Sequence, residues 1–180
     1  MNEEWSVKPI SGEKGADLLP DIVWKSIQET YGALNIIILG SGDKNIEYQL
    51  SELTKSYSNF ALDLGYKEYL SHKIYASCDF LLMPSRVEPC GLNQMYAMRY
   101  GTVPIVRYTG GLRDTVEDVS TGGSGINFGT ASAEDAVHAI HRALHIYHKD
   151  EMMEKLVQSN MGFDFSWEKS AQKYLELYRK

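Results

Sequence analysis

Apolar and polar positions along this chain of 180 residues follow two periods, one typical of strands and the other typical of helices. Residues 34–39 form a short apolar run rich in isoleucine, which predicts a buried strand, whereas residues 17–31 carry apolar side chains at helical spacing. The same patterns predict strands at 7–10, 60–64, 79–83, 103–106 and 126–128, and helices at 44–57, 66–77, 92–101, 133–148, 150–160 and 166–179. Strands that alternate with helices through short glycine-containing turns predict an α/β fold with a parallel sheet and helices on both of its faces.

Two local signals refine these elements. Pro104 lacks a backbone N–H, so its strand is expected either at the edge of the sheet or to start near this residue. Ser132 has the side chain of a helix N-cap, and Glu134 follows in the first turn of the predicted helix. The sequence contains no internal repeat, low-complexity tract or linker, so residues 1–180 are predicted to form a single domain.

Composition excludes several classes of protein. The net charge is −6 and the basic residues are scattered, which argues against nucleic-acid binding, because phosphate backbones require a basic stripe. No apolar run approaches the ~18 residues of a membrane span, and residues 1–6 lack the apolar stretch of a signal peptide. Two cysteines, Cys78 and Cys90, are too few for a disulfide framework and are not spaced as a metal site, which favours a reducing, cytoplasmic compartment.

The loop after the fourth predicted strand carries the strongest chemical signal. Pro89 keeps Glu88 extended and outside the following helix. Gly91 allows a close backbone approach, and the N–H groups of Leu92 and Asn93 fall in the first turn of the helix, where phosphate binds. The alternative is that Glu88 is an ordinary solvated acid. The pattern favours a nucleotide-sugar site in which the carboxylate touches the group attached to the phosphate.

Other candidate residues lie in turns that follow or precede strands, and each also has an ordinary structural interpretation. Gly42 belongs to a Gly-Ser-Gly turn that either closes tightly or approaches a ribose or base. Tyr66 presents an aromatic face that could stack on a base. Thr109 and Gly110 begin either a flexible loop or a nest of N–H groups, and Lys14 is either solvated or a diphosphate ligand. Turns that follow strands share one edge of a parallel sheet, where ligands bind.

Four histidines, at positions 138, 141, 145 and 148, lie on one face of a predicted helix. This spacing suggests metal binding, but no carboxylate or cysteine completes a ligand shell, so a solvated helix face is the preferred interpretation. The sequence therefore predicts no metal site.

Three blocks of sequence stand out as a set: Pro84-Ser85-Arg86 with Glu88-Pro89-Cys90-Gly91-Leu92-Asn93-Gln94, then Tyr100-Gly101-Thr102, then Thr109-Gly110-Gly111-Leu112-Arg113-Asp114-Thr115. Together they resemble the glycogen and starch synthases, over a region from about Lys14 to the C-terminus. The resemblance implies the C-terminal, donor-binding half of a GT-B enzyme, which has two Rossmann-like domains. Such enzymes transfer glucose from ADP-glucose or UDP-glucose to the non-reducing end of an α-1,4-glucan, with retention of configuration and without a metal or other cofactor.

The resemblance also implies roles for individual residues. Glu88 would contact the transferred glucose and stabilise its oxocarbenium-like transition state, and Lys14 would neutralise the leaving diphosphate. Tyr66 would stack on the nucleobase. The remaining nucleotide-sugar-binding residues would be Gly42, Cys90, Gly91, Leu92, Asn93, Thr109 and Gly110.

The chain departs from the family pattern in its first loop, where Pro9 replaces an arginine that grips the diphosphate and Glu13 replaces a glutamine. A lost charge-assisted hydrogen bond costs about 1.5–3 kcal/mol. The N-terminal acceptor domain, through which an α-glucan would bind, is also expected to lie outside this chain, which predicts that the chain alone does not elongate glucan. The alternatives are a non-catalytic module that binds a partner or glucan, and another GT-B enzyme such as an epimerase. The resemblance places the protein in the cytoplasm, or in a plastid for a plant or alga.

Overall fold

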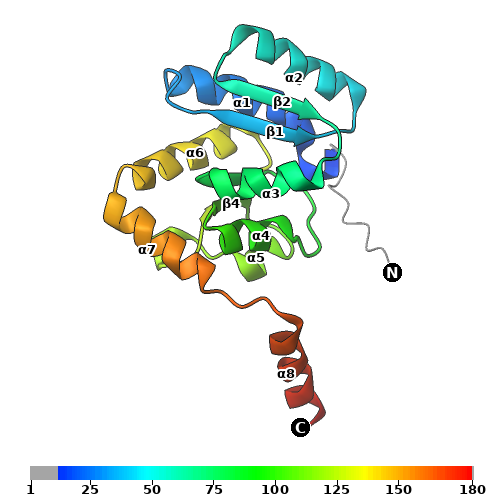
Figure 1. Cartoon of the computed structure of the whole chain (residues 1–180), viewed down its shortest axis with the longest axis vertical. Helices are drawn as coiled ribbons and strands as arrows, with labels where there is room; N and C mark the ends of the chain where they lie inside the picture. The colour runs from blue at the N-terminus through cyan, green and yellow to red at the C-terminus, as the bar shows by residue number, and fades with distance from the viewer. Residues whose placement is uncertain (1–11, 180) are drawn as a thin grey trace.

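The computed structural model describes residues 12–179, and the strand predicted at 7–10 lies outside them (Figure 1). The strands are β1 (Ile36–Gly40), β2 (Phe60–Leu64), β3 (Phe80–Met83), β4 (Val103–Arg107) and β5 (Ile126–Phe128). The α-helices are α1 (Leu19–Glu29), α2 (Lys44–Ser56), α3 (Glu68–Ser77), α4 (Asn93–Tyr100), α5 (Leu112–Thr115), α6 (Ala133–Tyr147), α7 (Asp150–Met161) and α8 (Trp167–Tyr178). Three single-turn 3₁₀ helices complete the described chain: η1 (Gly12–Lys14), η2 (Ala16–Leu18) and η3 (Val119–Thr121).

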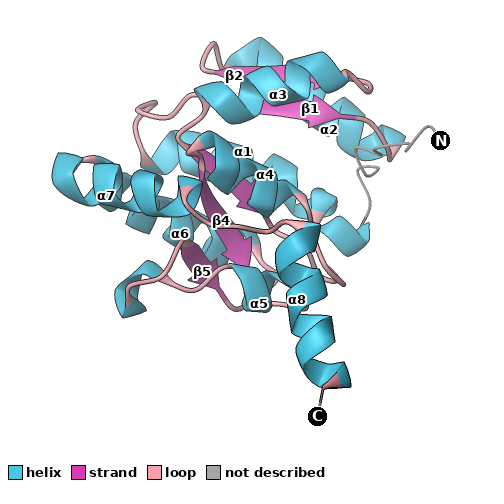
Figure 2. Ribbon diagram, turned by 60° about the horizontal axis from the view of Figure 1, so that its bottom comes forward, coloured by secondary structure: helices cyan, strands magenta, loops and turns pink. Residues whose placement is uncertain are grey.

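Every strand pair within the described residues is parallel, as the alternating pattern predicts. β1 pairs with β2, and β3, β4 and β5 pair in that order. The α/β class is therefore confirmed, but residues 12–179 form two sheets, of two and three strands, instead of one. Helix α1 packs against both α2 and α6, and so connects the two sheets (Figure 2).

Helices cover both faces of the three-stranded sheet. Successive side chains of β4 point to opposite faces, so this strand contacts helices on both sides. Val103 and Ile105 pack in one core cluster with α6 side chains such as Val137. Val106 packs on the other face with Met98 of α4 and with the first residue of α5. This strand is buried on both faces, which explains its continuous apolar sequence.

Pro104 lies in the central strand of this sheet, so the expected edge position is wrong, whereas the expected strand start is correct. The Val103 N–H donates to the Asp79 carbonyl on the β3 side. Neighbouring residues of a strand direct their N–H groups to opposite sides, so the nitrogen of Pro104 faces β5. Pairing with β5 begins only at Ile105, one residue later. Proline therefore removes no ladder hydrogen bond here.

Caps define the ends of several helices. The Ser132 side chain accepts a hydrogen bond from the Asp135 N–H at the start of α6, which confirms the predicted N-cap. Gly101 ends α4 in the left-handed region, with φ of 87°, which a glycine adopts at low energy. The four-residue helix α5 was not predicted, because so short a segment shows no helical period. Helix α8 has no buried residue and extends away from the body of the chain (Figure 1).

Candidate functional site

The loops that follow β3 and β4 meet at the carboxyl edge of the three-stranded sheet. The Gly111 N–H donates to the Glu88 carbonyl at 2.8 Å. Gly110 packs so closely on this carbonyl that a Cβ at Gly110 would lie 2.9 Å from the Glu88 carbonyl carbon. The structure therefore brings together Glu88 and the Thr109–Gly110 turn, which the sequence places 21 residues apart.

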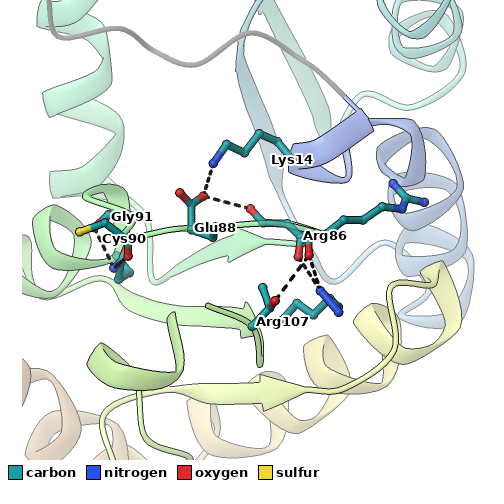
Figure 3. A network of polar contacts seen from close by, with 9 residues as sticks. Lys14, Arg86, Glu88, Cys90, Gly91 and Arg107 are labelled. Atoms are coloured by element: carbon teal, nitrogen blue, oxygen red, sulfur yellow. Dashed lines mark hydrogen bonds and ion pairs between the residues drawn. The ribbon is translucent and has the colours of Figure 1, made fainter. Parts of the chain in front are cut away.

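Glu88 is buried, with only 3% of its surface exposed, so its interpretation as a solvated loop acid is wrong. Its carboxylate accepts hydrogen bonds from the Lys14 ammonium group at 2.6 Å and from the Ser85 hydroxyl at 3.3 Å (Figure 3). Lys14 keeps 20% of its side chain exposed. The two predicted catalytic residues thus form an ion pair that is open to solvent mainly on the lysine side.

Arg107, at the end of β4, donates hydrogen bonds to the loop that carries Glu88. One of its terminal nitrogens donates to the carbonyls of Ser85 at 3.2 Å and of Arg86 at 2.8 Å (Figure 3). Its Nε donates to the Gly129 carbonyl at 3.3 Å. Sequence reasoning did not select Arg107. A usable signal was present, because a charged residue there ends an otherwise buried strand.

The N-terminus of α4 lies beside Glu88. Gly91 has φ of 78°, Leu92 is the N-cap, and the first backbone hydrogen bond of the helix runs from the Tyr96 N–H to the Leu92 carbonyl. The N–H groups of the first helical turn, beginning with Asn93, therefore have no acceptor within the helix and favour an anion. Leu92, Asn93 and Cys90 are exposed here, whereas Gly91 is buried.

Gln94 fixes the shape of this corner from inside the protein. Its side chain is fully buried, and Nε2 donates to the carbonyls of Cys90 at 3.3 Å and Gly91 at 3.1 Å and to the Thr115 hydroxyl at 3.0 Å. A Cβ at Gly91 would lie 2.5 Å from the Gln94 Oε1 atom, so glycine is required for this close approach. Gln94 appeared in the sequence motif, but its role as a brace was missed.

Gly42 and Tyr66 follow the strands of the other sheet. The Gly65 N–H donates to the Gly40 carbonyl at 3.1 Å, so these two turns lie together. The Gly42 N–H already donates to the buried Glu47 carboxylate at 2.8 Å. It is therefore not available to a ligand, and Gly42 could contact a ligand only by close approach of its backbone. Tyr66 is 51% exposed. Partial burial first, and then the nearby Glu68 carboxylate, raise the pKa of Tyr66, which stays a neutral phenol with an accessible face.

One histidine of α6 contacts a glutamate of another helix. His141 pairs with Glu29 of α1, with 3.0 Å between Nε2 and the carboxylate. Within residues 12–179, no three side chains of His, Cys, Asp or Glu gather closely enough to hold a metal ion. The same part of the chain contains no helix with the length and apolar character needed to cross a bilayer.

Residues 5–160 match the family described as glycosyl transferases group 1. Among similar proteins, glycogen synthase from Flavobacterium johnsoniae is 50% identical over 167 residues, which is 92% of this chain and 35% of that protein. Glycogen synthase 2 from Geobacter metallireducens is 47% identical over 171 residues, 93% of this chain and 35% of that protein. The chain thus spans about a third of the length of these curated relatives.

Solved structures agree with this result. The catalytic domain of starch synthase IV from Arabidopsis thaliana, solved with ADP and acarbose, matches with a TM-score of 0.81 and 34% identity, over 99% of this chain and 39% of that chain. Sucrose-phosphate synthase from Thermosynechococcus elongatus matches with a TM-score of 0.70 and 22% identity, over 96% of this chain and 43% of that chain, and supports the fold alone. The resemblance to glycogen and starch synthases and the α/β fold of a GT-B domain are confirmed. The chain belongs to the glycosyl transferases group 1 family.

Proposed function

We propose that this chain is the donor-binding part of a glycogen or starch synthase, which binds the nucleotide and glucosyl groups of ADP-glucose or UDP-glucose. The observation that carries the proposal is the Lys14–Glu88 ion pair beside the N-terminus of α4. A cation, a carboxylate and helix N–H groups without an acceptor in the helix suit a glucosyl diphosphate, whose phosphates are anionic and whose sugar becomes positively charged during transfer.

In the proposed reaction, the bond between glucose C1 and the diphosphate oxygen breaks, and C1 forms a bond with a hydroxyl oxygen at the end of the glucan. The electron pair of the broken bond leaves with the diphosphate, and the proton of the acceptor hydroxyl passes to that leaving diphosphate oxygen. Lys14 would compensate the charge that develops on the diphosphate, and Glu88 would stabilise the positive charge that develops on the sugar ring. Tyr66 would stack on the base. The glucan would bind mainly to the part of the enzyme outside this chain, and the chemistry needs no metal.

Calorimetry with ADP, ADP-glucose, UDP and UDP-glucose tests the proposal. ADP-glucose is the first donor to try, because the similar starch synthase IV domain was solved with ADP. Lys14→Ala should weaken ADP binding by about 10- to 100-fold, which corresponds to the ~1.5–3 kcal/mol of a charge-assisted hydrogen bond. Glu88→Gln should weaken ADP-glucose more than ADP, because Glu88 is assigned to the sugar.

Lys25→Ala provides a matched control. Lys25 also forms an ion pair with a glutamate, Glu134, and its side chain is 25% exposed, close to the 20% of Lys14. This variant should bind ADP like the unchanged protein. If none of the four nucleotides binds at millimolar concentration, the donor site is refuted and the alternative of a non-catalytic module is favoured, since that module needs no nucleotide.

A further inference from the structure

The segment that carries Lys14 is fastened to the loop that carries Glu88 by a set of hydrogen bonds outside the pair itself. The N–H groups of Arg86 and Val87 both donate to the Glu13 carbonyl, at 2.8 and 3.0 Å. Glu13 therefore holds the loop through its backbone, and its own side chain is exposed.

The Arg86 side chain adds a second connection. Its Nη2 atom donates to one carboxylate oxygen of Asp17 at 2.9 Å, and its Nη1 atom donates to the other at a shorter distance. Nη1 also donates to the Gly12 carbonyl at 3.0 Å. A planar guanidinium that meets a carboxylate through two parallel hydrogen bonds fixes orientation as well as distance. Arg86 thus contacts both ends of the segment from Gly12 to Asp17, with Lys14 between them.

Gly15 packs against the backbone of Pro84, at the start of the loop that carries Glu88. It has φ of 69°, and a Cβ there would lie 2.8 Å from the Pro84 carbonyl carbon and nearer still to its oxygen. The two backbones therefore touch directly one residue after Lys14. Between the Glu13 carbonyl and the Gly15 contact, the Cα of Lys14 has little freedom to move relative to Glu88.

Figure 3 shows the direction in which each side chain extends. Lys14 extends toward Glu88, whereas the guanidinium of Arg86 points away from Glu88. Arg86 is engaged with Asp17 and Gly12, and so it does not contribute its charge to the pocket. Its effect on a ligand would have to pass through the segment that it holds.

We infer that Arg86 and Asp17 form a positioning pair that holds Lys14 against Glu88 before the donor binds. The use of this placement for a diphosphate rests on the proposed function above. A preordered lysine loses less conformational freedom when the ligand arrives, and groups fixed in advance bind better than groups that must be ordered. The pair is thus a determinant of donor affinity.

Arg86→Ala tests the inference with ADP as the probe in calorimetry. We expect binding to weaken on the order of tenfold, in line with a lost hydrogen bond to a charged group. In a Lys14→Ala background, the same substitution should cause almost no further loss, because the residue being positioned is gone. A loss of equal size in both backgrounds, or no loss in either, would overturn the inference.

Arg142→Ala is the matched control, because Arg142 pairs with Asp118 and its side chain is 32% exposed, against 37% for Arg86. It should lower stability without changing ADP affinity, and an equal loss of affinity in this control would count against a specific role for Arg86. Asp17→Asn, which keeps the shape of the side chain, should reproduce the effect of Arg86→Ala even if the latter folds poorly.

Amide hydrogen exchange in the ligand-free chain separates this inference from the proposed function. The Arg86 and Val87 amides, which donate to Glu13, should exchange faster in Asp17→Asn, while amides of the α6 helix keep their rates. If the unchanged chain binds no nucleotide, the proposed function fails and exchange alone decides about the pair. Unchanged exchange at both amides would then overturn it.

Discussion

Gly110→Ala is a direct test of how tightly the two loops of the site are packed. Gly110 has φ of 46°, and a Cβ at this position would lie 2.9 Å from the Glu88 carbonyl carbon. Carbon atoms in contact prefer about 3.5–4.0 Å, so the Glu88 carbonyl carbon alone requires a movement of roughly 0.6–1.1 Å. The Glu88 carbonyl oxygen would lie nearer still to the added methyl group, so the backbone must move farther than this. The Gly111 N–H bond to the Glu88 carbonyl resists this movement.

The expected effect has two parts. An alanine in the left-handed region costs about 1–2 kcal/mol at any site. Displacement of a positioned group by about 1 Å can reduce its effectiveness by as much as ~100-fold. Gly110→Ala should therefore weaken ADP-glucose binding by about 10- to 100-fold and should destabilise the protein by more than the backbone term alone.

Gly32→Ala isolates the backbone term, because Gly32 has φ of 77° and a Cβ added there would have no heavy atom of another residue within 4 Å beyond its chain neighbours. Urea unfolding should show a loss of about 1–2 kcal/mol for Gly32→Ala and a larger loss for Gly110→Ala. Calorimetry should show weaker ADP-glucose binding only for Gly110→Ala. Equal stabilities and equal affinities for the two variants would refute the tight contact between Gly110 and Glu88.

Three further predictions concern other parts of the fold. Gln94→Leu should lower the free energy of unfolding by about 1–3 kcal/mol, because the buried Gly91 carbonyl loses its side-chain donor; urea denaturation measures this, and an unchanged midpoint would contradict it. Burial raises the pKa of Asp118, but hydrogen bonds from Arg142 and Ser120 outweigh it and hold that pKa well below its ordinary value. The Asp118 contribution to stability is therefore complete above the unfolded pKa of about 3.9 and is lost as pH falls below it. Asp118→Asn should therefore reduce the loss of unfolding free energy at acidic pH, measured by denaturation at a series of pH values. An unaltered loss would argue against this. Asp43 accepts hydrogen bonds from two amides in the first turn of α2, and Asp43→Ala should cost about 1 kcal/mol in thermal unfolding, a prediction that an unchanged melting curve would rule out.

The sequence determined the elements whose signals are local. The bounds of β2 and β5 agree with those predicted from the apolar pattern, and the Ser132 cap and the Gly101 helix end were found from residue type alone. These features depend on side-chain period and on backbone preferences, which a few neighbouring residues decide. The motif around Glu88 also carried the family resemblance without any structure.

Only the tertiary structure decided how the candidate site is assembled. Lys14 and Glu88 are 74 residues apart, and the hydrogen bonds that join their segments come from backbone N–H groups as well as from side chains of remote residues. Such hydrogen bonds leave no period in the sequence, which is why the roles of Arg107 and Gln94 were missed. The central position of β4 was missed for the same reason: whether a strand has one neighbour or two depends on how the sheet is ordered, and Pro104 is compatible with the centre only because pairing with β5 starts one residue later.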